Sequence, residues 1–518
     1  MITFIFTTGV TQNMNTFKRK ALASAVLGTL GVAGSAHAIY QDPNNLGQAL
    51  IYPYYTVNND PAGNPFNTFV SVVNTTTDAK VVKVRFREGK ASEEVLDFNL
   101  YLSPNDVWTG AVVPSSTDTT SAGHLVTADL SCTNPPIPAG GIDFRNYQYV
   151  GDPVAHDAVD RTREGYAEMF EMAVIDPTTA VWTAVVHQFG SGGAPACGSI
   201  VTGNPAGGGA VAAAAVFPPT GGLSGTGTLI NVTSGRDTMY NADAFGAWSL
   251  LATYSEIGND LPNFSATSPA SSVVNDPSKN RVYFSTWSST TQSGLTVTAG
   301  ARAAASTMMH DNVINEYILD AATGSNTDWV LTFPVKRLFV HGTAAITPFT
   351  TALSKTGACE TISVTYFNRE EVGASPAGVD FSPSPPGAAP NSLCWESTVM
   401  SIRNGSTNAP APGSAPTSLV LGSQNVTAVT VSSNFQNGWA RVHFAGANAS
   451  AVGLASEAAS VTVTAGVAAA GAETFFGLPV VGFMIRTFSN GTLTCGTASC
   501  QGNYGGSVSH AYTLNVLP

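Results

Sequence analysis

Apolar and polar residues alternate with a period of two along much of the chain, which is the spacing of strands with one buried face. In the segment 82–87, one face carries Val82, Val84 and Phe86 and the other carries Lys83, Arg85 and Arg87. Polar turns such as 74–78 and 103–106 separate these short segments. The pattern predicts an all-β fold of antiparallel, immunoglobulin-like β-sandwich domains with long loops and one or two short helices.

Other segments with aromatic and β-branched residues are predicted as strands on the same grounds. They are Trp182–His187, Thr228–Val232, Arg281–Trp287, Trp329–Val340, Thr361–Phe367, Val426–Ser432, Trp439–Phe444 and Val480–Phe488. Apolar residues in Met308–Leu319 recur at helical spacing, so a helix is predicted there. Tyr166–Val174 fits both periods, so helix and strand both stay open, and a strand is favoured because its surroundings are β.

Stretches rich in Gly, Ala and Pro at 205–219, 376–390 and 408–417 are predicted as surface loops. A boundary near 342–348 divides the mature chain into a β-sandwich-rich domain, 39–345, and a C-terminal β domain, 346–518.

Residues 1–38 are predicted to be an N-terminal extension and a signal peptide. Lys18, Arg19 and Lys20 precede an apolar run, 21–33, that ends at Ala36-His37-Ala38. Cleavage is expected after Ala38, and Met14 is the expected start. The run is shorter than the roughly 20 residues that span a bilayer, and no transmembrane helix is expected in the mature chain. The expected location is the cell surface or the extracellular space, with the periplasm as the alternative.

Charged residues make up 11% of the chain, against about 25% in typical soluble domains. The formal net charge is −12, and removal of the three basic leader residues leaves 19 basic against 34 acidic residues, near −15. So few cations cannot neutralise a phosphate backbone, which excludes nucleic acid as a partner. The expected partners are copies of the same chain or components of the envelope.

Six cysteines in an exported chain indicate disulfides, and six allow 15 pairings. Pairing neighbours along the chain gives Cys132–Cys197, Cys359–Cys394 and Cys495–Cys500. Zinc is disfavoured because there is no C-x₂-C pair.

Catalytic motifs are sparse. The sequence Gly222–Thr226 approaches G-x-S-x-G but lacks the last glycine, and H-E-x-x-H does not occur. Whether the protein is an enzyme stays open, with a non-enzyme favoured and no catalytic residue assigned. His156, Asp157 and Asp160 are the candidate metal ligands, although solvated loop residues are the preferred interpretation. No cofactor is expected; loop aspartates leave calcium as an alternative.

Tyr52, Tyr54 and Tyr55 form an aromatic cluster. Such rings could stack on sugars or contact a partner, so they are the candidate ligand-binding residues. Packing of the tyrosines on the domain from an edge strand is preferred, because Pro53 breaks central strands.

Several segments resemble a group of uncharacterised exported bacterial proteins, some labelled cell-surface proteins. They are Asn74–Thr76, Lys80–Gly89, Val95–Pro104, Asp106–Thr109, Arg163–Tyr166, Asn315–Tyr317, Thr327–Trp329, Phe333–Pro334, Lys336–Arg337, Gly477–Val480 and Asn503–Gly506. The resemblance implies a Gram-negative envelope or extracellular location and carries over no catalytic residue.

These features predict an exported structural or adhesive surface protein that associates with itself or with the envelope. A glycan- or peptide-binding β-sandwich module is the alternative, and an exported hydrolase with a non-local site is the second alternative.

Overall fold

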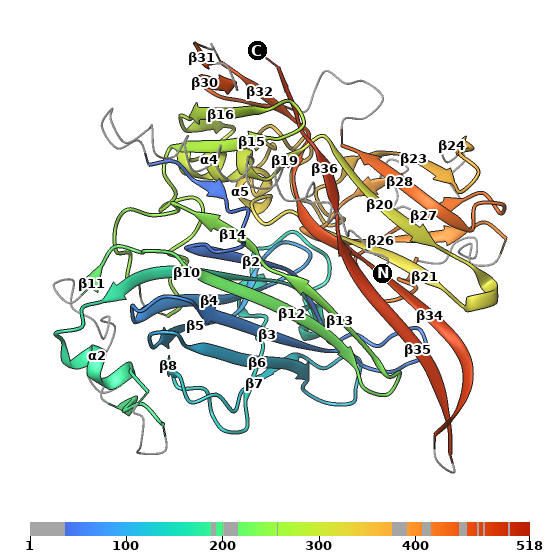
Figure 1. Ribbon diagram of the computed structural model, residues 1–518, viewed down its shortest axis with the longest axis horizontal. Coiled ribbons are helices and arrows are strands. Elements are labelled where there is room, and N and C mark those ends of the chain that lie inside the picture. The colour runs from blue at the N-terminus through green and yellow to red at the C-terminus, as the bar shows by residue number, and fades with distance from the viewer. Residues whose placement is uncertain are drawn as a thin grey trace, which may run out of the picture.

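The computed structural model describes residues 37–187, 193–198, 200, 216–255, 257–374, 391–406, 416–444, 453–463, 466–469, 472–495 and 498–517. Strands account for 47% and helices for 8% of the structure (Figure 1), which confirms the predicted all-β class. The strand pairs are antiparallel apart from β26 (Ser397–Asn404) with β27 (Val426–Val431), which is parallel.

Two sheets built from residues 40–246 face each other as a sandwich (Figure 1). The eight-stranded sheet has the order β1 (Tyr40–Gln41), β14 (Asp243–Gly246), β2 (Ala49–Thr56), β10 (Glu164–Ile175), β4 (Lys80–Glu88), β5 (Glu94–Leu102) and β8 (Cys132–Asn134), with β11 (Val216–Phe217) beside β10. The six-stranded sheet has the order β13 (Arg236–Asn241), β12 (Leu223–Asn231), β3 (Asn67–Asn74), β6 (Val107–Pro114), β7 (Gly123–Val126) and β9 (Ile142–Asp143). Their shared core contains Val84, Phe86, Val72 and Trp108.

Two five-stranded sheets form the rest of the main body. One has the order β27, β26, β21 (Asn326–Thr332), β34 (Val481–Cys495) and β35 (Ala498–Ser509). It is buried on both faces, because Trp329 belongs to one core cluster and its neighbour Val330 to the sandwich core. The other has the order β24 (Gly373–Ala374), β23 (Ser363–Asn368), β28 (Asn437–His443), β20 (Asn312–Ile318) and β36 (Ala511–Thr513).

Smaller elements complete the fold. The small sheets are β15 (Ser271–Asp276), β16 (Arg281–Thr286), β30 (Ala458–Val463) and β31 (Gly466–Ala469); β17 (Thr290–Gln292) and β18 (Leu295–Val297); β19 (Met309–His310) and β33 (Leu478–Pro479); β22 (Glu360–Thr361) and β25 (Ser392–Leu393); and β29 (Gly453–Ala455), β32 (Thr474–Phe476) and β37 (Asn515–Leu517). The helices are α2 (Ala180–Val185), α4 (Ala299–Thr307), α5 (Arg337–Val340) and the 3-10 turns η2 (Tyr147–Tyr149), η3 (Val159–Arg163) and η5 (Ala321–Thr323). No helix in the described ranges is long and apolar enough to cross a membrane.

The predicted division between residues 345 and 346 runs through shared sheets. Strand β20 pairs with β28, and β21 pairs with both β26 and β34. Residues 39–345 and 346–518 are therefore joined by backbone hydrogen bonds within shared sheets and by a common core.

Two secondary-structure predictions need correction. The segment predicted as a helix at Met308–Leu319 contains strand β20, whose Val313 and Tyr317 point into the core while Ile314 and Ile318 are half-buried on the other face. Apolar residues on both faces of a short strand imitate helical spacing. The segment predicted as a strand at Trp182–His187 is largely helix α2, which Thr179 begins by accepting a hydrogen bond from the backbone nitrogen of Trp182.

The prediction of a strand at Tyr166–Val174 is confirmed by β10. The strand predicted at Trp329–Val340 ends at Thr332, and its last residues form α5.

Candidate functional site

The three candidate ligand-binding tyrosines are buried on β2. Tyr52 and Tyr55 are 1% exposed and Tyr54 is 0% exposed. The Tyr52 hydroxyl donates a hydrogen bond to Ser71 O (2.7 Å), and the Tyr55 hydroxyl donates one to Thr162 O (3.1 Å). The Tyr54 hydroxyl donates one to Glu164 Oε2 (2.8 Å). The rings therefore pack inside the sandwich, as preferred from the sequence, and present no face to a sugar.

The predicted edge position of this strand is wrong, because β2 lies between β14 and β10. A bulge accommodates Pro53 there: Tyr55 pairs with Gly165 and Tyr52 with Ala167, so two residues of β2 oppose one residue of β10. A proline inside a sheet is tolerated at such a bulge.

Of the candidate metal ligands, His156 and Asp157 lie in the loop before η3 and Asp160 lies in the first turn of η3. His156 Nε2 and Asp160 Oδ1 are 2.8 Å apart, and the side chains are 47% and 27% exposed. Asp157 is exposed, and its backbone oxygen accepts a hydrogen bond from Asn146 Nδ2. Within the described ranges, no three His, Cys, Asp or Glu side chains gather closely enough to hold a metal ion. The calcium alternative stays a prediction.

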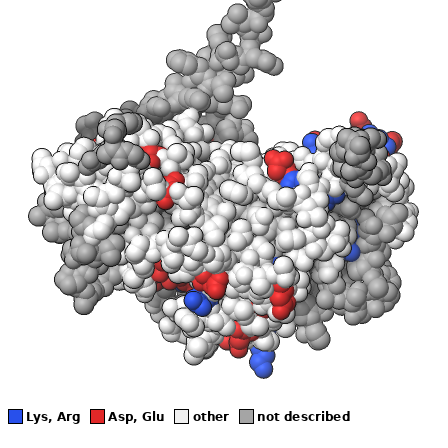
Figure 2. All heavy atoms as spheres, turned by 90° about the horizontal axis from the view of Figure 1, so that it is seen from below, with Lys and Arg blue, Asp and Glu red and all other residues white. Residues whose placement is uncertain are grey.

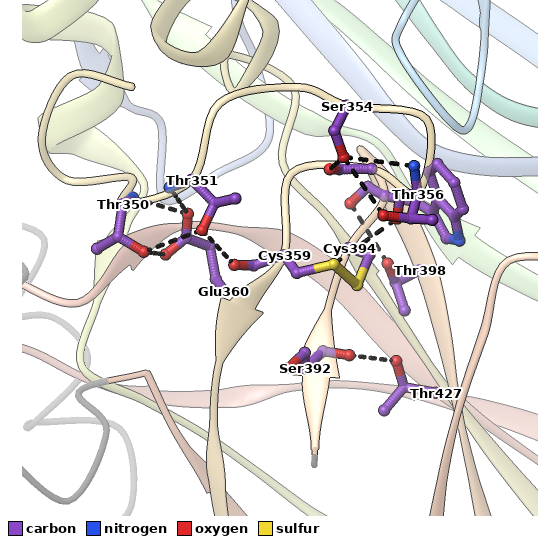
Figure 3. Close-up of a disulfide and its surroundings, with 12 residues drawn as sticks. Thr350, Thr351, Ser354, Thr356, Cys359, Glu360, Ser392, Cys394, Thr398 and Thr427 are labelled. Atoms are coloured by element: carbon purple, nitrogen blue, oxygen red, sulfur yellow. Dashed lines mark hydrogen bonds between the residues drawn. A yellow bond between two sulfur atoms is a disulfide. The ribbon is translucent and has the colours of Figure 1, made fainter. Parts of the chain in front are cut away.

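Two of the three predicted disulfides are confirmed. Cys132 is bonded to Cys197 and Cys359 to Cys394. Figure 3 shows the second bond beside Glu360, whose carboxylate accepts hydrogen bonds from Thr350 and Thr351 and so fixes the loop before β22. The side chains of Cys495 and Cys500 lie outside the described part of the chain, and their pairing stays a prediction.

The charged face of β4 is buried under the segment 257–264. We call this cluster the ionic layer; it comprises Lys83, Arg85, Arg87, Glu94, Asp97, Glu168, Asp260 and Arg337. The contacts are Lys83–Asp97 (2.5 Å), Arg85–Glu94 (2.7 Å), Arg85–Glu168 (3.3 Å), Arg87–Glu168 (2.8 Å), Arg87–Asp260 (2.9 Å) and Arg337–Asp260 (2.9 Å). Arg85 also donates to the backbone oxygens of Asn259 and Pro262, which holds the covering segment in place.

Electrostatics in this layer follow from burial and pairing. Burial lowers the pKa of Lys83, which Asp97 opposes. Desolvation alone would raise the pKa of Asp260, but Arg337 and Arg87 hold that pKa well below its usual range. Each cation of the layer contacts a carboxylate, so the arrangement is suited to fixing strands and loops together.

A second buried group lies at the end of β4. Arg161 contacts both oxygens of Glu88 at 2.7 and 2.8 Å and also contacts Asp152 at 2.5 Å, and these side chains have no exposed surface. Glu88 additionally accepts hydrogen bonds from the backbone nitrogens of Lys90 and Ala91.

A third group contains Lys336 and Glu396. Lys336 Nζ donates to the backbone oxygens of Cys394 and Trp395, next to the disulfide. Burial raises the pKa of Glu396 to about 8, although Lys336 opposes the shift. A carboxyl group with that pKa can exchange a proton at neutral pH.

In contrast to these buried charges, the outer face of the six-stranded sheet is uncharged over most of its area. Backbone pairing aligns one row across five strands: Met239, Thr228, Phe69, Ala111 and Val126. The adjacent row is Asn241, Thr226, Ser71 and Thr109, and the next is Ser224, Val73 and Val107. We call these three rows the neutral face.

The neutral face exposes large apolar side chains: Met239 is 58%, Val107 48% and Phe69 46% exposed. None of its residues is a lysine or an arginine. Carboxylates lie at its margins: Asp129 Oδ2 accepts a hydrogen bond from the backbone nitrogen of Thr109, and Asp237 and Asp143 belong to one further row at the end of the sheet. Ser224 belongs to the sequence that approaches the hydrolase motif G-x-S-x-G, and it lies on strand β12 of this face. The nucleophile of that motif lies on a sharp strand-to-helix turn, so the position of Ser224 does not match it.

The surface elsewhere is also poor in charge. Nine of the 22 lysine and arginine residues are buried within the described ranges. Figure 2 shows one side of the molecule, where charged side chains form small separate groups on a mostly uncharged surface.

Sequence reasoning found the charged face of β4 but missed its carboxylate partners. The structure shows what the signal for these partners is: Glu168 on β10 and Asp97 on β5 are both paired with Arg85 across the sheet, so the three side chains lie on the same face. The neutral face was missed because its rows form only once the register of five strands is known.

Comparison with known proteins gives no relative from which a function could be transferred. No family model, curated protein or solved structure matches the chain.

Proposed function

We propose that this chain is an exported structural protein of the cell surface or extracellular space that associates with copies of itself through the neutral face. The observation that carries the proposal is the row from Met239 to Val126, which is apolar apart from Thr228 and whose Met239 and Phe69 side chains are exposed. Exposed apolar patches of this kind mark interaction sites on soluble proteins.

The neutral face is smaller than a standard protein interface. Its three rows hold five, four and three residues. With about 4.8 Å between strands and about 6.8 Å between rows, they cover on the order of 400 Å². Each partner buries roughly 800 Å² of accessible surface in a standard interface, so residues that flank the neutral face must complete the contact.

The distribution of charge decides where a second copy can bind. Mature chains with a net charge near −15 repel each other where acidic surfaces meet, so contact is least opposed where carboxylates are sparse. Since Asp237 and Asp143 lie in one row at the end of the sheet, a two-fold arrangement places these two acidic rows at opposite ends of the interface. The row from Met239 to Val126 carries no carboxylate itself.

Export is supported by the leader sequence and by the two disulfides, which form in oxidising compartments. An envelope component could also occupy the neutral face, and sedimentation of the purified protein separates this outcome from self-association.

The proposal is tested by sedimentation velocity of the mature protein, residues 39–518, over a range of concentrations. Wild type is expected to form larger species as concentration rises, and Met239→Lys or Phe69→Lys is expected to weaken this association at least tenfold. The control is Val150→Lys, because Val150 is 91% exposed and belongs to none of the three rows of the neutral face. A wild-type protein that stays monomeric at every concentration, or equal association by all variants, contradicts the proposal.

A further inference from the structure

The residues around the expected cleavage site are part of the folded core. Ala38 is 6% exposed and Ile39 is 0% exposed. Ile39 lies in the same core cluster as Phe245, Trp248 and Val274. The bond that the leader peptidase must reach is therefore inside the folded molecule.

Backbone hydrogen bonds hold this segment on both sides. The nitrogen of Ile39 donates to Ser271 O (2.9 Å), and its oxygen accepts from the nitrogen of Val273 (2.8 Å), so it pairs with β15. The next residues, Tyr40 and Gln41, form β1 and pair with β14 of the eight-stranded sheet. Residues 39–41 thus join two sheets, β15 above and β14 below (Figure 1).

We propose that the leader is removed before the chain folds, and that the folded precursor resists the leader peptidase. Hydrolysis adds one water across the Ala38–Ile39 peptide bond and leaves a carboxylate on Ala38 and an ammonium group on Ile39. A protease binds an extended, exposed segment in its cleft, and sites protected by native structure are cut only after local or global opening. Opening here breaks the bonds to β15 and β14 and exposes Ile39, which keeps the open population small.

The inference rests on the export part of the proposed function and is independent of self-association. It also gives residues 39–41 a second role, because the processed end of the chain becomes the strand that joins the two sheets.

The test uses the full precursor, either folded or unfolded in urea and diluted immediately into the assay, with a bacterial leader peptidase in detergent micelles. Product mass is measured over time. The unfolded precursor is expected to be cut after Ala38 at least 100-fold faster than the folded one. Equal rates for the folded and unfolded precursors would overturn the proposal.

A matched variant isolates burial as the cause. Insertion of a Gly-Ser-Gly-Ser-Gly spacer between Ala38 and Ile39 keeps the Ala36-His37-Ala38 motif and the strand from Ile39 onward, but it lets the cleavage site leave the core. The folded spacer variant is expected to be cut nearly as fast as the unfolded wild-type precursor. Resistance of the folded spacer variant would show that burial is not what protects the bond, and would also overturn the proposal. Circular dichroism and urea unfolding check that both precursors are folded before the assay.

Discussion

Arg161 contacts both carboxylate oxygens of Glu88, at 2.7 and 2.8 Å, and neither side chain has exposed surface. The pair ties η3 to the end of β4, next to the loop that leads into β5. Because both charges are out of water, the geometry must be held closely for the pair to be stable. The same holds for the buried pair of Arg85 and Glu168 in the ionic layer, so the protein uses many of its few charges inside the fold.

Glu88→Ala is expected to lower the free energy of unfolding by about 3–5 kcal/mol, because it leaves the Arg161 guanidinium buried with Asp152 alone. Urea unfolding at neutral pH measures the change. The control is Glu316→Ala, which breaks an ion pair with Arg486 at a glutamate that is 64% exposed. That change should cost less than about 1 kcal/mol. Equal effects of the two substitutions would show that burial of the first pair is unimportant.

Stability is expected to fall as pH rises from about 4.5 to 8 through Glu396. Burial raises the pKa of this carboxyl to about 8 in the folded state, above its value in the unfolded chain. A raised folded pKa gives a contribution that is fully present below the unfolded pKa and is lost as pH rises through the folded pKa. Each tenfold difference in proton affinity between the folded and unfolded states corresponds to about 1.4 kcal/mol of stability.

Urea midpoints of wild type and Glu396→Gln between pH 5 and 8.5 test this expectation. The variant should lose less stability over this range, since its side chain does not titrate. Parallel curves for the two proteins would mean that Glu396 does not carry the pH dependence.

The strand pattern could be predicted from the sequence where one face is apolar. Val82, Val84 and Phe86 identified β4 and its inward face, and Cys132–Cys197 followed from order along the chain. The predictions failed where tertiary contacts, and not the local pattern, decide whether a segment is a helix or a strand. Helix α4 is buried, and its buried residues include Ala301, Ala304 and Ala305, whose small side chains carry little hydrophobic signal. Strand β20, which comes shortly after α4 in the chain, has apolar residues on both faces.

The candidate site could be predicted only in part, for a similar reason. The sequence shows that Tyr52, Tyr54 and Tyr55 cluster, but not that a bulge at Pro53 keeps them in a central strand. Glycines on β12 make room for the rings: a Cβ atom on Gly225 would lie 2.1 Å from the Tyr52 hydroxyl. Such long-range complementarity is a property of the assembled sandwich.

Tyr54→Phe is expected to destabilise the protein by about 1–3 kcal/mol, because the hydroxyl donates a buried hydrogen bond to the Glu164 carboxylate. Thermal or urea unfolding measures the loss. Tyr504→Phe is the matched control, since Tyr504 is 54% exposed and the change should be within about 0.5 kcal/mol. Loss of glycan binding in a stably folded Tyr54→Phe protein would contradict the assignment of these tyrosines to the core.

Reduction should weaken the fold through both disulfides. The cysteines of Cys132–Cys197 are 65 residues apart in sequence, and closing a loop of that length stabilises by about 4 kcal/mol in the chain-entropy model. Replacement of both cysteines by serine is expected to lower the urea midpoint accordingly. Alkylation without reduction should leave Cys132, Cys197, Cys359 and Cys394 unlabelled; labelling of these four in the native protein would contradict the assigned bonds.

The central claim, self-association through the neutral face, is tested most directly by negative-stain electron microscopy of the mature protein, residues 39–518, next to the Met239→Lys and Val150→Lys variants. The account predicts regular oligomers, fibres or lattices for wild type and Val150→Lys, and dispersed particles for Met239→Lys. Dispersed monomers in all three samples, or the same assemblies in all three, would contradict it.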